Sequence, residues 1–176
     1  MNEALRQGLA DWATRASEMA ADKVVLATGS VTRPAKIPSP SLQLTITIPS
    51  LQVGQDEKYI GETLDGRAVT THVYQRRAVI TCLATGELAA TYLGKLRKAV
   101  SKGQFKRLAT SLGFEVLEVS SVMDASGVID TGWEERAVAE ITITWSEEES
   151  TTYDGTIESA VVTGTADSID VEVTAP

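Results

Sequence analysis

The chain holds few side chains of the types that enzymes use as nucleophiles, bases or metal ligands. Its 176 residues include one histidine, His72, and one cysteine, Cys82. A serine–histidine–acid triad would need His72 as its base, and His72 lies in the strand-like segment TTHVY. The chain has no G-x-S-x-G turn that would present a serine nucleophile. A zinc site built from several thiolates is excluded by the single cysteine.

The remaining motif candidates are equally weak. Cys82 lies in the apolar run AVITCLA, where a thiol behaves as a small buried hydrophobe rather than an activated nucleophile. We expect His72 to be a strand residue at the surface or at a subunit contact. The glycines of ATGS and VTGTAD are isolated and form no phosphate-binding loop, and DASGVID lacks the repeated acids of a calcium loop. The sequence therefore predicts no cofactor, no metal and no enzymatic activity.

Paired carboxylates leave one alternative open. Glu134 and Glu135 are adjacent, and Glu147–Glu149 form a run. Such carboxylates can act in acid–base chemistry, but charge runs beside a strand are usually solvated. A small binding module or enzyme would use the loop at 51–68 with Glu134, Glu135 or His72. That alternative requires a concave pocket and strongly perturbed ionisation.

The charge is divided unevenly along the chain. The net charge is −8, yet residues 1–114 carry +6 and residues 115–176 carry −14. Such asymmetry favours a role in interaction over a role in catalysis, with a merely solubilising acidic surface as the alternative. The acidic third would repel nucleic-acid phosphates.

Basic residues are concentrated between Leu88 and Phe114, which hold six bases and no acid. Lys95, Lys98 and Lys102 are expected on one helix face by the three/four spacing rule. This face could be simply solvated, could contact DNA or an acidic protein, or could pack head to tail against the acidic part of a second copy. The candidate interface residues are Lys95, Lys98, Lys102, Lys106, Arg107, Glu134, Glu135, Arg136, Glu147, Glu148 and Glu149.

These residues must be positioned by a mixture of helices and strands. Leu5, Leu9, Trp12, Ala16 and Met19 draw one helical stripe, with Asn2 as its N-cap. The period is two in the strand Leu42–Ile48, which we expect to end at Pro49, and in the strand Ala137–Trp145. Before the second of these strands we expect a strand at 24–27, a proline-stiffened connection at 28–41, a loop or extended hairpin at 51–68 and a β-run at 68–84. This β-run is interrupted at Arg76–Arg77 either by a turn or by an exposed stretch of a long strand. The later elements are a helix from Glu87 to near Gly103, a shorter helix ending at Gly113, a strand at 114–122 and a loop at 123–132.

Together these elements predict an α+β fold in which a mixed or antiparallel sheet packs with two main helices. Residues 1–149 are expected to form one domain, and residues 150–176 an extended, acidic, β-prone arm. The N-terminal segment lacks the pattern of a signal peptide, and no apolar run is long enough for a membrane span. We therefore expect a soluble protein made in a reducing cytoplasm, without a membrane partner.

Three segments resemble the neck terminator and tail terminator proteins of tailed bacteriophages. They are GWEERAVAEITITW (132–145), RPAKIPSPSLQLTITIPS (33–50) and TIESAVVTG (156–164). The resemblance follows the order of elements over most of the chain. It implies a tail-terminator-like fold and no catalytic residues.

The resemblance also implies a function. Such a protein forms a ring, hexameric in this family, at the head-proximal end of the tail, where it stops tail tube polymerisation and joins the tail to the head–tail connector. The implied partners are further copies of the chain, the tail tube protein, connector or adaptor proteins and, as a further candidate, the sheath. DNA would pass through the lumen without specific binding, in a virion assembled in the host cytoplasm. A tail tube or tail-completion subunit is the nearest alternative.

Overall fold

The computed structural model describes residues 1–27, 39–53, 57–62, 68–129, 132–152, 161–166 and 169–174. Over these residues it confirms the α+β class, with a mixed sheet and three α-helices. The helices are α1 (Glu3–Ser17), α2 (Ala89–Ala99) and α3 (Gly103–Ser111), and a 3₁₀ turn spans Ala21–Lys23. The strands are β1 (Val24–Ala27), β2 (Ser41–Gln52), β3 (Glu57–Glu62), β4 (Ala68–Thr85), β5 (Glu115–Val119), β6 (Met123–Asp124), β7 (Gly127–Ile129), β8 (Gly132–Glu134), β9 (Arg136–Thr152), β10 (Val161–Ala166) and β11 (Ile169–Thr174).

The chain divides into two compact units. The larger unit comprises Met1–Gln55 and Tyr74–Glu147, and the smaller comprises Asp56–Val73 and Glu148–Pro176. Strands β4 and β9 each contribute residues to both units. The expected division into a domain of residues 1–149 and an arm stays a prediction.

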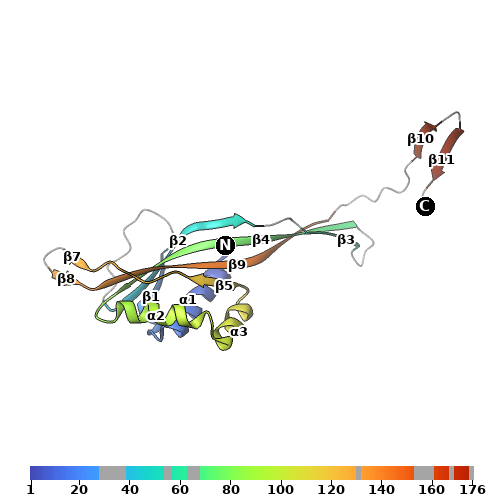
Figure 1. Cartoon of the computed structure of the whole chain (residues 1–176). Coiled ribbons are helices and arrows are strands. Elements are labelled where there is room, and N and C mark those ends of the chain that lie inside the picture. The colour runs from blue at the N-terminus through green and yellow to red at the C-terminus, as the bar shows by residue number, and fades with distance from the viewer. Residues whose placement is uncertain are drawn as a thin grey trace. The chain divides into compact units, whose positions relative to one another are not determined.

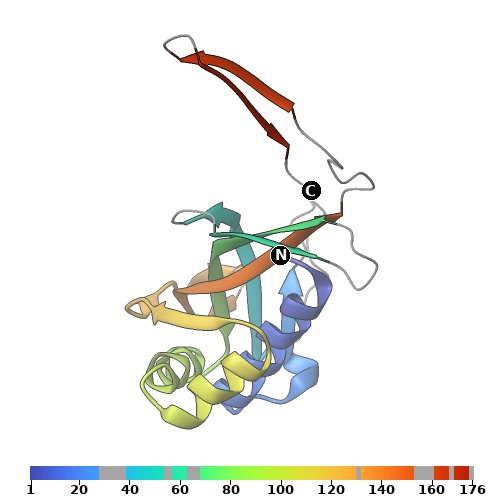
Figure 2. The same cartoon turned by 90° about the vertical axis from the view of Figure 1, so that its right-hand side faces the viewer.

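The larger unit is built on a mixed sheet with the strand order β1-β2-β4-β9-β5. β1 runs parallel to β2, β2 runs antiparallel to β4, and β5 and β6 run antiparallel to β9. The three helices lie together on one face of this sheet (Figures 1 and 2). α1 contacts α2, α3 and β1, which places it centrally in the helical layer.

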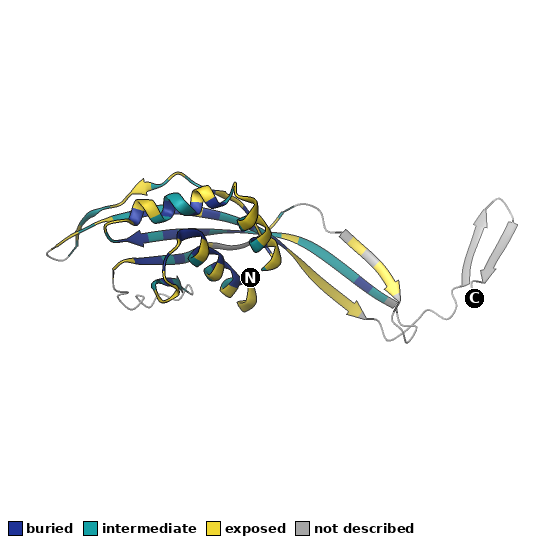
Figure 3. Cartoon of the chain, turned by 90° about the horizontal axis from the view of Figure 1, so that it is seen from below, coloured by how far each residue is buried: buried dark blue, intermediate teal, exposed yellow. Residues whose placement is uncertain are grey.

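The hydrophobic core lies between this sheet and the helices. Alternate residues of β9 point inward and are buried, as the period of two predicts: Ala137, Ala139, Ile141, Ile143 and Trp145. Ala78, Ile80, Cys82 and Ala84 do the same on β4. The helices complete the core mainly with Leu9, Trp12, Ala13, Leu93 and Leu96. Figure 3 shows the buried residues along the strands and the helix faces that meet them.

The two expected helix-capping positions are confirmed. Asn2 is the N-cap of α1, and its side-chain oxygen accepts a hydrogen bond of 2.9 Å from the Leu5 amide. Gly113 follows α3 with a φ of +86°, a conformation that glycine adopts without strain. The Phe114 and Gly113 amides donate to the Ala109 and Thr110 carbonyls, the pairing of a Schellman motif.

Three local expectations need correction. β2 does not end at Pro49 but continues to Gln52, because its register against β4 shifts on both sides of Ile48 and so tolerates a residue without an amide hydrogen. Residues 123–132 are not a plain loop, since β6 pairs with β9 and β7 with β8. Arg76 and Arg77 lie inside one continuous strand, so the long strand is confirmed and the turn is wrong, although both residues are half-buried rather than exposed.

The smaller unit is built from strand pairs. β3 pairs antiparallel with the first residues of β4, so the hairpin expected for part of 51–68 is confirmed. The Thr71 and Ser150 hydroxyls, on β4 and β9, share a hydrogen bond of 2.8 Å. β10 and β11 form a second antiparallel pair. Most of the connection expected at 28–41 lies outside the described residues.

The one-sided core makes the inward face of β9 sensitive to the loss of apolar side chains. We expect Ile143→Ala to lower the free energy of unfolding by about 2–5 kcal/mol, because it removes fully buried methylene groups and leaves a cavity. Glu140→Ala, at an exposed position of the same strand, should change it by less than about 0.5 kcal/mol. Urea unfolding followed by circular dichroism measures both. Equal effects would contradict the assignment of the two faces.

Candidate assembly surfaces

The basic residues do not share one helix as expected. α2 ends at Ala99, and Lys102 occupies the N-cap position of α3 with an extended backbone (φ −85°, ψ 123°). The expectation of a single face through Lys95, Lys98 and Lys102 is therefore wrong. Four of the predicted bases are exposed at the α2–α3 end of the helical layer, where Arg97 is exposed as well, and we call these four the basic surface: Lys98, Lys102, Lys106 and Arg107.

Lys95 is engaged within the chain. Its ammonium lies 2.6 Å from an Oε2 of Glu18, the residue that follows α1 in the left-handed conformation. The hydrogen bond from Lys95, then the charge of Lys95 and that of Lys102, lower the pKa of Glu18. The pair ties α2 to the end of α1, so Lys95 is less available to a partner than the four bases of the basic surface.

The predicted acidic residues are distributed between both units. Glu134 accepts two hydrogen bonds on one oxygen from Arg136, at 3.0 Å from Nε and 2.6 Å from Nη2. Glu147 accepts one from Nε of Arg76 at 3.0 Å. The Arg76–Glu147 pair is exposed, and exposed pairs contribute little stability. Glu148 and Glu149 are exposed residues of β9 in the smaller unit.

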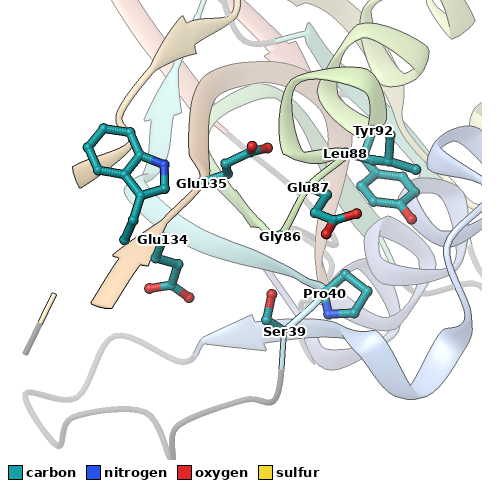
Figure 4. Close-up of a pocket in the computed structure, with 9 residues that line it drawn as sticks. Ser39, Pro40, Gly86, Glu87, Leu88, Tyr92, Glu134 and Glu135 are labelled. Carbon is teal, nitrogen blue, oxygen red and sulfur yellow. The ribbon is translucent and has the colours of Figure 1, made fainter. Parts of the chain in front are cut away.

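A concave pocket lies beside Glu134 and Glu135, at the end of the larger unit where α2 begins. It has a volume of about 660 Å³, and we call it the acid-lined pocket. Figure 4 shows the Glu134 and Glu135 side chains on one side and those of Glu87, Leu88 and Tyr92 on the other. Its lining residues are Ser39, Pro40, Gly86, Glu87, Leu88, Tyr92, Trp133, Glu134 and Glu135.

The backbone around Gly86 brings the two sides of this pocket together. The Gly86 amide donates to the Glu135 carbonyl at 2.9 Å, and the Gly86 carbonyl accepts from Ala89 at the start of α2. Gly86 has a φ of +99°, and an added Cβ would lie 2.8 Å from the Ser39 Oγ. Only glycine fits this turn without displacement.

The pocket offers carboxylates, the hydroxyls of Ser39 and Tyr92, and apolar surface, but neither a histidine nor a cysteine lines it. His72 belongs to the smaller unit and Cys82 is fully buried, with its pKa raised far above the usual range by burial. No cluster of three potential metal ligands occurs among the residues that the structure describes. Glu87 and Glu135 have no ion-pair partner among the described residues, so the pocket suits a cationic partner. No helix in the described parts is long and apolar enough to cross a membrane.

Sequence reasoning missed the apolar members of this pocket. Trp133 is 69% exposed and Leu88 is 53% exposed, and neither was a candidate site residue. Leu88 falls within the helix expected from Glu87, but it precedes α2 as the N-cap residue. The available signal was the pair of apolar residues Val128 and Trp133 on either side of the sequence Asp-Thr-Gly, residue types that are common between the strands of a short hairpin.

The turn at Gly86 can be tested against a second glycine. We expect Gly86→Ala to destabilise the protein by about 1–3 kcal/mol, because alanine is strained at this φ and its Cβ meets Ser39 and Pro40. Gly94→Ala is the control: Gly94 lies inside α2 with nothing within 4 Å of an added Cβ, so it should stabilise by about 0.5–1 kcal/mol. Thermal and urea unfolding measure the stability of both variants. Destabilisation by both would contradict the claim that the turn at position 86 specifically requires glycine.

The Lys95–Glu18 pair predicts a lowered pKa for the Glu18 carboxyl. NMR of the Glu18 carboxyl should give a pKa below the ordinary value of 4.5, and Lys95→Ala should return it toward that value. Because the folded-state pKa is lowered, the pair stabilises the fold above pH 4.5 and ceases to do so as the pH falls through the folded-state pKa. Lys106→Ala is the control and should leave the titration unchanged. An unaltered pKa in Lys95→Ala would show that the pair does not form in solution.

Comparison with known proteins agrees with an assembly role. No curated protein matches the chain significantly. A family model described as phage neck terminator protein matches residues 3–171, nearly the whole chain. The chain therefore belongs to the phage neck terminator family, whose members are structural proteins of the virion tail and neck.

Proposed function

We propose that this protein forms a ring, hexameric in its family, at the head-proximal end of a phage tail. There it terminates polymerisation of the tail tube and joins the tail to connector or adaptor proteins of the neck. The family match over residues 3–171 carries the proposal. The tail tube protein is the second partner and the sheath a further candidate, and assembly takes place in the host cytoplasm. No catalytic role is proposed.

Two oppositely charged surfaces support a contact between copies. The basic surface lies at the C-terminal end of α2 and on α3, and the acid-lined pocket lies where α2 begins. Because the two surfaces differ, one copy's basic surface can meet the next copy's pocket in a head-to-tail contact. Such heterologous contacts close into a ring when the rotation between copies permits.

The remaining acids suit a channel that DNA traverses. Glu148 and Glu149 are exposed and have no ion-pair partner in the described parts of the chain. In the proposed ring, carboxylates facing the lumen would repel the DNA phosphates and prevent adhesion. Glu134, Glu135, Arg136 and Glu147 are proposed as contact residues together with the basic surface, and Lys95 acts through its pair with Glu18.

Light scattering of the purified protein over a range of salt concentrations tests the ring. We expect a six-subunit mass at low salt that decreases as salt screens the charged contacts. Lys98→Glu with Lys102→Glu should give monomers with an unchanged fold, because it places carboxylates against carboxylates. Lys23→Glu with Lys58→Glu makes the same change in net charge elsewhere and should leave the rings intact.

Addition of isolated tail tubes separates the alternatives. A terminator caps the tube ends and stops growth, whereas a tail tube subunit extends them. A wild-type protein that stays monomeric at high concentration and neither caps nor extends tubes would overturn the proposal in favour of a small binding module. Rings from the Lys98→Glu, Lys102→Glu variant would show that the basic surface is only solvated.

A further inference from the structure

The β7–β8 hairpin displays two large apolar side chains to solvent. Val128 and Trp133 are directly opposed across the two strands, so their side chains lie on the same face of the hairpin. They are 73% and 69% exposed, the latter unusual for tryptophan. A two-stranded hairpin gains little stability from an exposed pair. Tryptophan is, by contrast, the residue type most enriched among the energetically dominant residues of protein interfaces.

Carboxylates lie beside Trp133 of this apolar pair. Glu134 follows Trp133 directly and is held by Arg136, while the neighbouring Glu135 and Glu87 have no ion-pair partner among the described residues. The partner of the hairpin should therefore combine an apolar recess with positive charge.

A recess of this kind occurs on the same chain, between the end of α1 and α3. It has a volume of about 460 Å³ and is lined by Arg15, Gln104, Phe105, Arg107, Leu108 and Ser111. Phe105 and Leu108 supply apolar surface, and Arg15 and Arg107 are exposed at its sides without ion-pair partners in the described residues. We call it the α1–α3 recess.

The floor of the α1–α3 recess is held in place before any partner binds. The Trp12 indole N–H donates to the Phe105 carbonyl at 3.1 Å. The two rings also meet edge to face, with centroids 6.5 Å apart and an interplanar angle of 77°. Trp12 is buried in the core, so Phe105 is anchored to the rigid part of the unit. Preorganisation of this kind lowers the entropic cost of binding.

We propose that Trp133 of one copy inserts into the α1–α3 recess of the next copy, and that this contact joins the subunits of the ring. Phe105 and Leu108 cover the indole, Arg107 or Arg15 lies over its face as a cation–π partner, and the same guanidinium groups face Glu134 and Glu135. The inference rests on the proposed function, because it assigns the contact between copies that a ring requires.

A single copy cannot make this contact with itself. Figure 1 shows the β7–β8 hairpin at one end of the larger unit and α3 toward the other. α2 alone, with 11 residues, spans about 16 Å between the acid-lined pocket and the basic surface. The contact is therefore between copies and heterologous, with the hairpin on one side and the recess on the other.

A heterologous contact predicts a specific result when two defective variants are mixed. Trp133→Ala removes the hairpin side of the contact, and Arg15→Glu with Arg107→Glu reverses the charge of the recess. Each variant alone should be a monomer at concentrations where the wild type forms rings, with association weakened by at least about 30-fold. Their mixture should give particles of two subunits, because one intact contact remains per pair.

Leu117→Ala is the matched control, since it removes an apolar side chain that is 40% exposed on β5 and lines neither the acid-lined pocket nor the α1–α3 recess. It should form rings of wild-type mass. Circular dichroism and urea unfolding verify that every variant is folded, and the altered side chains are exposed enough for that to hold. Where the wild type assembles only on tail tubes, the same variants are scored for assembly there.

Three outcomes overturn the inference, and they are distinguishable from failure of the proposed function. Wild-type rings from Trp133→Ala show that the ring uses another contact. Rings from Trp133→Ala that no longer cap tubes show that Trp133 binds the tube or connector protein. Monomeric single variants whose mixture stays monomeric exclude a heterologous contact between these surfaces. The proposed function itself fails where the wild-type chain extends tail tubes, or where it assembles neither alone nor on tubes.

Discussion

The burial of one face of the sheet under three helices is the constraint on which the larger unit depends. Every second residue of β9 from Ala137 to Trp145 is buried, and β4 provides the matching row beside it. A slip of one residue in β9 would bring Glu140 into the core, so the apolar alternation fixes the register. With the register fixed, the strand ends are fixed too. The turn at Gly86 and the β7–β8 hairpin occupy those ends, and their positions follow from the core.

The smaller unit has no comparable row of buried apolar residues among its described positions. Its part of β4 is rich in threonine, and its link between β4 and β9 includes the hydrogen bond between Thr71 and Ser150. β10 and β11 form a two-stranded pair by themselves. Strand pairs of this size are marginally stable in isolation. The lack of a buried apolar row among the described residues therefore distinguishes the smaller unit physically from the larger one.

The parts of the fold that depend on local patterns were predictable from the sequence. The stripe of α1 with its Asn2 cap, the alternation of β9 and the glycine after α3 each depend on neighbours within a few residues. The pairing of Lys95 with Glu18 joins residues 77 positions apart, and no sequence periodicity predicts such a contact. The acid-lined pocket likewise combines Ser39, Gly86 and Trp133 from three distant segments. Charge was a useful guide to the residue types of the candidate site. The exposure of Trp133, however, depends on the β7–β8 hairpin, and the polar, glycine-containing sequence around it was interpreted as a loop.

Charge and apolar shape have different roles in the proposed contact between copies. Electrostatic attraction between the basic surface and the acid-lined pocket acts over about 8 Å at physiological salt and tolerates many orientations. It can speed the encounter of two copies, but it cannot define a single angle between them. An indole held in a recess with a fixed Phe105 floor admits few orientations. A ring closes only if the same angle repeats at every contact, and the apolar contact is therefore the one that determines closure.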